Sequence, residues 1–410
     1  MENGKGTDSH SETLKKFKRN VKDILTPIDT DPYLLKWLKA KNHDVKKAEA
    51  TFREMHAFRE LYSLDTICET YTKPDIAEKY EYTAFLGYAK DGSIIRYNPL
   101  GKGDHYGFIA SMSAYQLGYY GCHIMEEDLK RQRMRAKMTG KNVTEITYIF
   151  DLAGLALHDI LHKCVYEMGL DLGLLVQEYY PEIWGNIFFI NVPPYFDTIF
   201  NMFKPMMRMS VIQKIQVLSR ESTGEVLLQY IDEDVLPVFL GGKRVDSTGN
   251  PKCSEFLRFG GRVPEKYYLC NQSSCDLQPN DVGVKDVWLR ARKVYNHSVV
   301  VTKPNTSIRV QLRTENGSIH MSIYYRKFDT TDISELDIPS ESEHLDEKDQ
   351  KCRVTKISPS MRVQSHMSPI NDFNVAPHPG IYIYRFNNSH SWFASRRLIF
   401  RVQVIENDSS

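Results

Sequence analysis

The stretch that decides the fold is YPEIWGNIFFINVP, which runs from Tyr180 to Pro193. Its second half, residues 187–192, is a short apolar run rich in β-branched and aromatic side chains, which is typical of a buried strand. Similar runs occupy residues 146–150 and 214–218, and the segments between the runs, roughly residues 158–180 and 195–206, have helical character. Strands that alternate with helices predict a mainly parallel sheet with crossover helices.

The segments on either side of this region have a different character. The first part of the chain has the spacing of short amphipathic helices, with Asp44 placed to cap one of them. We therefore expect a helical lobe over residues 9–75 and an α/β domain over residues 76–246.

After about residue 251 the helical periodicity disappears and short alternating segments follow one another. Turn-forming pairs such as Asn316-Gly317 separate them. Alternation with turn punctuation predicts an antiparallel, jelly-roll-like β-sandwich over residues 252–405. The expected strands are residues 298–301, 307–312, 319–325, 380–386 and 397–405.

Bulk composition narrows the class of protein. A chain of 410 residues with 41% hydrophobic residues fits two or three folded domains. Its formal net charge of +1 argues against a protein that binds a nucleic-acid backbone. The N-terminus lacks the apolar core of a secretion signal, no run of about 18 apolar residues occurs, and the seven cysteines are scattered. These features predict a soluble, cytoplasmic protein with reduced thiols.

Several segments, in this order and spacing, resemble the CRAL-TRIO family, which includes phosphatidylinositol-transfer and tocopherol-transfer proteins. A later segment, PGIYIYRFNNSHS at residues 379–391, resembles the GOLD (Golgi dynamics) domain. The resemblance implies a CRAL-TRIO lipid pocket followed by a GOLD β-sandwich. The CRAL-TRIO segments are YLLKWLKAKNHDVKKA (33–48), IFDLAGL (149–155), YPE (180–182), INVP (190–193), KP (204–205), KI (214–215) and LPVFLGG (236–242).

The resemblance also implies a function. Proteins of this family hold one hydrophobic ligand, such as phosphatidylinositol or a tocopherol-like lipid, and exchange it with membranes. We therefore expect a lipid-binding and lipid-transfer protein without catalytic residues, with a bound lipid in place of any cofactor. Asp151, at the end of one expected strand, is expected to fix the turn that follows.

Residues 193–209 match the mobile lid over the family's pocket. Within this segment the apolar residues recur near helical spacing, which by itself favours an ordinary core helix. The resemblance instead favours a gate, whose methionines can adapt to varied acyl chains. The expected gate and pocket residues are Phe196, Ile199, Phe200, Phe203, Met206 and Met207.

Headgroup selectivity should come from a few polar groups. Glu182 and Lys214 match a pair that coordinates inositol phosphate in a phosphatidylinositol-transfer member of the family. An ammonium group neutralises a phosphodiester, and a carboxylate accepts hydrogen bonds from inositol hydroxyls. Ile183 and Val211, however, stand where that member has arginine and threonine, so a less polar ligand remains open.

A densely basic run offers a candidate membrane contact. Its default interpretation is a solvated helix face, and the functional alternative is contact with anionic headgroups. Because no aromatic residues are interleaved with it, we expect no nucleic-acid partner. The basic residues are Lys130, Arg131, Arg133, Arg135 and Lys137.

His158 and His162 lie one helical turn apart, as in a zinc-protease motif. Asp159 stands where that motif has glutamate, and no third ligand is evident, so we expect no metal site.

Two functions therefore remain. The first is a lipid carrier whose partners are its lipid and, transiently, a membrane surface. The second is a lipid-sensing trafficking adaptor whose GOLD domain binds a protein partner. A carrier moves lipid between vesicles, whereas a sensor binds lipid without moving it.

Overall fold

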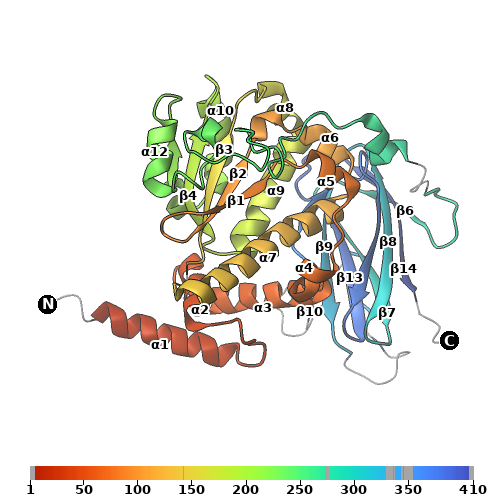
Figure 1. Ribbon diagram of the computed structural model, residues 1–410. Coiled ribbons are helices and arrows are strands. Elements are labelled where there is room, and N and C mark those ends of the chain that lie inside the picture. Colours follow the sequence, from red (N-terminus) through yellow and green to blue (C-terminus); the bar gives the residue numbers. More distant parts are fainter. Residues whose placement is uncertain are drawn as a thin grey trace.

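A computed structural model describes residues 5–141, 143–272, 277–328, 336, 338–342, 345 and 354–405, with side chains from Ser11 onward (Figure 1). An N-terminal helical part, a central α/β part and a C-terminal β part follow one another along the chain. The longer helices are α1 (Lys5–Asn20), α2 (Asp31–Ala40), α3 (Val45–Leu61), α5 (Asp75–Tyr80), α6 (His105–Ala110), α7 (Ala114–Thr139), α9 (Lys163–Tyr179), α10 (Phe196–Phe203) and α12 (Thr223–Tyr230). Shorter helices are α4 (Ile67–Thr70), α8 (Leu157–Leu161) and α11 (Met209–Ile212).

The N-terminal helices form a lobe that packs against the α/β part. Asp44 caps α3 as expected, because its side chain accepts a hydrogen bond from the backbone N–H of Lys47. The rings of Trp37 and Phe52 meet edge to face at 5.3 Å and both side chains are fully buried. Their cluster continues into α7 and α9, so the lobe shares a core with the central domain.

The central sheet is mainly parallel, as predicted. Its five strands are hydrogen-bonded in the order β1-β2-β3-β4-β5, with β1 antiparallel to β2 and the remaining pairs parallel. One face packs against α7 and α9, and the other face packs against α12 and the segment that follows it. The strands are β1 (Ala84–Tyr88), β2 (Ile94–Asn98), β3 (Ile146–Asp151), β4 (Trp184–Ile190) and β5 (Ile215–Val217).

The C-terminal part consists of two antiparallel sheets, as predicted. One sheet has the order β10-β9-β13-β7, with β11 also paired to β9, and the other has the order β12-β8-β14-β6. Their inner faces form one buried cluster. The strands are β6 (Lys285–Leu289), β7 (Val294–Val301), β8 (Thr306–Glu315), β9 (Ile319–Arg326), β10 (Val354–Lys356), β11 (Met361–Val363), β12 (Ile370–Ala376), β13 (Gly380–Asn387) and β14 (Arg396–Ile405).

The β part is joined to the helices by polar contacts. The Arg362 guanidinium lies 2.9 Å from Glu167 of α9, and the Arg362 backbone N–H donates to Asp171 at 3.0 Å. Lys356 pairs with Glu54 of α3 at 2.8 Å. The sandwich therefore rests directly on α3 and α9.

The segment expected as a single gate helix is broken. Helix α10 ends at Phe203, and a 3₁₀ turn, η3 (Lys204–Met206), follows it. Pro205 lacks the backbone N–H that would continue an α-helix, which explains the break. Among the described residues, no helix is both long and apolar enough to cross a membrane.

Candidate functional site

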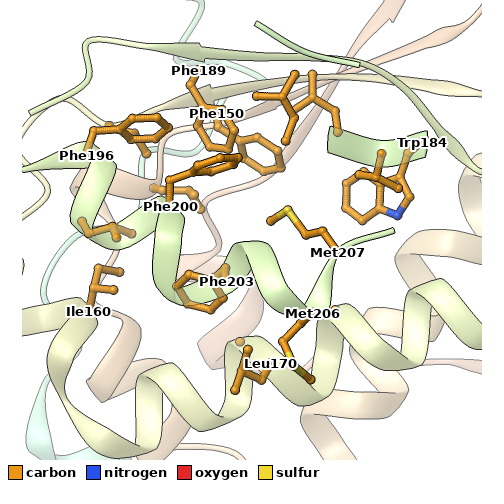
Figure 2. A pocket seen from close by; sticks show the side chains of 18 of the residues that line it. Phe150, Ile160, Leu170, Trp184, Phe189, Phe196, Phe200, Phe203, Met206 and Met207 are labelled. Atoms are coloured by element: carbon orange, nitrogen blue, oxygen red, sulfur yellow. The ribbon is translucent and has the colours of Figure 1, made fainter. Parts of the chain in front are cut away.

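An apolar cavity of about 330 Å³ lies between the sheet, helix α9 and the segment from α10 to α11. Its walls come from β3, β4 and β5 on one side and from α9 on another, and Figure 2 shows the side chains that surround it. The lining residues are Leu100, Phe150, Leu152, Leu155, Ile160, Gly169, Leu170, Gly173, Leu174, Gln177, Trp184, Ile187, Phe189, Phe196, Ile199, Phe200, Phe203, Met206, Met207, Val211 and Ile215.

All six residues predicted for the gate line this cavity. Phe196 packs against both Phe189 of β4 and Phe200, with ring centroids 5.1 and 5.8 Å away (Figure 2). Phe203 contacts the Tyr166 ring of α9 at 5.3 Å. The α10–η3 segment thus forms one wall of the cavity, and its far end is exposed to solvent at Met206.

Glu182 and Lys214, the predicted headgroup pair, lie together at one end of the cavity. They line a small polar recess that shares Gln177, Trp184 and Val211 with the apolar space. Both residues precede strands, Glu182 before β4 and Lys214 before β5, so the parallel sheet brings them to the same edge. Ile183, by contrast, is buried in the core and does not line the recess.

Each member of the pair contacts a different partner. The Glu182 carboxylate lies 2.8 Å from the Lys39 ammonium. The Lys214 ammonium lies 3.0 Å from the Glu145 carboxylate and donates to the Trp184 carbonyl at 2.5 Å. Lys36 donates to the Glu182 carbonyl at 3.4 Å. The recess therefore joins charges from the N-terminal lobe and from two strand starts.

Sequence reasoning did not include Lys36, Lys39 or Glu145 in this site. Both lysines lie within the quoted lead-in segment, so their basic spacing was visible, but their contact with Glu182 spans more than a hundred residues of chain. Burial lowers the pKa of Lys36 to about 8, although the Glu145 and Glu182 carboxylates partly oppose this effect. The hydrogen bond to Glu182 raises the pKa of Lys39.

The basic run on α7 is partly occupied by other contacts. Lys130 pairs with Glu69 at 2.7 Å, and Arg131 pairs with Glu127 at 2.6 Å while it stacks on Phe85. Arg135 lies over the Tyr88 ring at 4.7 Å. Arg133 and Lys137 are exposed. The run is therefore less open than its sequence indicates, and its contact with a membrane stays a prediction.

The two histidines of the zinc-like motif are engaged separately. His158 lies 3.1 Å from Asp159, and the Nδ1 atom of His162 lies 3.0 Å from the Cys164 sulfur. In the part of the chain that the structure describes, no three His, Cys, Asp or Glu side chains are placed to hold a metal ion. Asp151 accepts hydrogen bonds from Tyr97, Asn191 and the Ala153 backbone, which fits a structural role.

Several known proteins are similar to this chain. The chain is 22% identical to Protein ctg-1 of Caenorhabditis elegans over 388 residues, which cover 94% of this chain and 95% of that protein. The crystal structure of Sfh5 is also similar, with a TM-score of 0.48 and 17% identity, over 66% of this chain and 96% of that chain. The family model of the CRAL/TRIO domain matches residues 78–242, the region that contains the parallel sheet and the cavity. Residues 78–242 of this chain are therefore a CRAL/TRIO domain, the domain of a lipid-binding family.

Proposed function

We propose that this chain is a lipid carrier, which holds one hydrophobic ligand in the apolar cavity and exchanges it with membranes. The observation that carries the proposal is the composition of the cavity wall. Among the described lining residues, Gln177 alone has an amide, hydroxyl or charged side chain. Such a wall suits an acyl chain or another hydrocarbon ligand, and exchange involves no catalysed change of a covalent bond.

The energetics of an apolar wall favour exchange in both directions. Burial of a methylene group is worth about 0.8 kcal/mol relative to water. The same burial is close to neutral relative to the bilayer interior, because both environments are apolar. The ligand is thus held strongly against loss to water but can return to a membrane.

The size of the cavity bears on the ligand. Its volume of about 330 Å³ is near the lower limit of the roughly 300–1,000 Å³ found in small-molecule sites. A phospholipid with two acyl chains therefore requires outward movement of the α10–η3 wall, whereas a compact neutral lipid requires less. Met206 and Met207, unbranched and adaptable, lie where that movement would occur.

The polar recess supplies the headgroup site of the proposal. Lys214 would neutralise a phosphodiester, and Glu182 would accept hydrogen bonds from headgroup hydroxyls. The C-terminal sandwich completes the proposed organisation as a GOLD domain, with the helical lobe over residues 9–75, the pocket domain over residues 76–246 and the sandwich over residues 252–405.

The test is mass spectrometry of lipid carried by the purified chain after incubation with mixed liposomes. The parent chain should carry close to one lipid per chain. In Gly173→Leu the new side chain starts from a position on α9 where a Cβ atom meets no other heavy atom within 4 Å. It should therefore occupy the cavity without distorting the helix, and the lipid content should fall to a small fraction of the parent value.

The matched control is Gly121→Leu. Gly121 is also inside a helix, α7, and a Cβ atom there also meets no heavy atom within 4 Å, but the residue does not line the cavity. Both variants replace glycine by a better helix former, which stabilises a helix by roughly 0.5–1 kcal/mol. Equal lipid content in both variants, whether high or low, contradicts the proposal.

A further inference from the structure

The turn between β13 and β14 carries two large exposed side chains. Trp392 is 69% exposed and Phe393 is 96% exposed, so almost the whole phenyl ring faces solvent. Aromatic side chains normally bury most of their surface, and adjacent exposed aromatics mark a surface that contacts something else.

The backbone that carries these rings is fixed. The buried Asn388 side chain donates to the carbonyls of Leu289, Arg290 and Ala394 at 3.2, 3.2 and 3.0 Å. The Arg292 N–H donates to the Asn388 carbonyl at 3.0 Å, and the Asn388 N–H donates to the Lys293 carbonyl at 2.9 Å. One asparagine therefore ties the β6–β7 turn to the β13–β14 turn. We call residues 290–293 and 388–395 together the sandwich tip.

The aromatic rings are accompanied by positive charge. The Arg292 guanidinium lies 3.8 Å from the Trp392 ring centroid, and Arg290 and Lys293 are exposed on the same turn. Within the described residues, none of these three cations forms an ion pair. Nearby, Arg397 of β14 pairs with Asp286 of β6 at 2.8 Å and with Glu315 of β8 at 3.2 Å.

The sandwich tip lies toward the start of α9. Arg396, the first residue of β14, donates to the Ser318 carbonyl at 3.3 Å, and the Ser318 hydroxyl donates to Glu167 of α9 at 3.4 Å. Helix α8 immediately precedes α9, and Figure 1 shows α8 and α10 at the top of the molecule and the C-terminus at the opposite end of β14. The tip thus lies toward the part of the molecule that carries α8 and the start of α9.

We propose that the sandwich tip docks the protein on bilayers that contain anionic phospholipids, with Trp392 and Phe393 at the headgroup level. Tryptophan and other amphipathic aromatics favour the membrane interface, and adjacent cations attract anionic headgroups. Two exposed rings beside three exposed cations that form no ion pair with any described residue fit this anionic surface. The inference rests on residues outside the cavity and so stands apart from the carrier proposal.

The test is flotation of the full chain with phosphatidylcholine vesicles that contain phosphatidylserine. Trp392→Ala/Phe393→Ala should weaken vesicle binding by roughly tenfold or more, because both rings lose their apolar contact with the bilayer. The matched control is Phe373→Ala. Phe373 is 59% exposed on β12 and lies beneath Arg309 at 5.7 Å, an arrangement similar to that of Trp392, but outside the tip. This control should bind vesicles like the parent chain.

A second variant separates charge from apolar contact. Arg290→Glu/Lys293→Glu should lower binding to anionic vesicles by roughly fivefold per residue and leave the weaker binding to pure phosphatidylcholine unchanged. If Trp392→Ala/Phe393→Ala binds vesicles as well as the parent chain does, the inference is wrong. It is then wrong even if the tip binds a protein. The lipid content of the cavity, measured in the same variants, should equal that of the parent. If the parent chain carries no lipid but its vesicle binding still depends on the tip, the carrier proposal is wrong and the docking proposal stands.

Discussion

The charged residues that line the polar recess are Glu182, Arg208 and Lys214, and each forms an ion pair, Arg208 with Glu178 at 3.2 Å. Glu182 is neutralised by Lys39 and Lys214 by Glu145, and the half-buried Lys36 interacts electrostatically with both pairs. A phosphate that enters the recess must compete with the Glu145 carboxylate for Lys214. The free energy that the phosphate gains from a charge-assisted hydrogen bond is therefore partly offset by the loss of the Lys214–Glu145 pair. This offset allows a headgroup to leave again.

Replacement of Lys214 by alanine tests the headgroup assignment. Lys214→Ala removes a cation that lines the recess, so affinity for an anionic phospholipid should fall by roughly tenfold. Affinity for a neutral apolar ligand should change little, because the cavity wall is intact. The control is Lys243→Ala, which breaks an exposed pair with Glu233 and does not line the recess. If both ligand classes weaken equally in Lys214→Ala, the residue is structural and the assignment is wrong.

At the scale of elements, helix α9 has two functions. One face, with Gly169, Gly173 and Gln177, lines the cavity, and another face, with Glu167 and Asp171, contacts β11 of the sandwich. Burial raises the pKa of Asp171 to about 6, and the Arg362 guanidinium only partly opposes this effect.

This raised pKa predicts a pH-dependent stability. The folded chain keeps the Asp171 proton to about pH 6, while the unfolded chain releases it near its ordinary pKa of 3.8, so stability is lost as the pH rises between these values. Asp171→Asn stays neutral and can still accept from the Arg362 N–H. The free energy of unfolding of Asp171→Asn should therefore exceed that of the parent by a gap that grows from pH 4 to pH 6. Above pH 6 the gap should level off at about 2–3 kcal/mol. Denaturant unfolding at several pH values measures this gap, and a gap independent of pH contradicts the assigned pKa.

The elements that the sequence predicted are those with an uninterrupted pattern. The apolar run before Asp151 and the alternating residues of β8 and β9 lie as expected. Strands β2 and β12 were missed because buried polar residues interrupt them. Arg96 of β2 is buried against Asp128 of α7, and Asn374 of β12 is buried where its amide donates to the Tyr384 hydroxyl. Such partners lie far away in sequence, so a local pattern does not reveal them.

The candidate site was predictable to a similar degree. The family resemblance led to Glu182, Lys214 and the gate residues, and the structure places the gate residues in the cavity and the pair in the recess that adjoins it. The cavity itself was not predictable from residue types. The sequence pattern around Phe196 and Phe200 would be the same in a filled core. Periodicity shows which side chains face inward, but it does not show whether they fill the space between them.

At the scale of the whole molecule, the three parts are connected through the walls of the cavity. The helical lobe supplies Lys36 and Lys39 to the polar recess, and the sandwich rests on α9, which lines the apolar space. The α10–η3 wall takes part in none of these contacts, and Met206 at its end is exposed. We therefore expect the opening movement to occur in this segment while the rest of the framework stays in place.

The most direct test of the carrier proposal is transfer of a fluorescent phospholipid or tocopherol-like lipid between two vesicle populations by a small, known amount of the full chain. The account predicts that each protein molecule moves many lipid molecules and that Gly173→Leu abolishes the transfer while Gly121→Leu does not. A chain that binds lipid but moves no more than one molecule per protein would contradict the account and favour a lipid sensor.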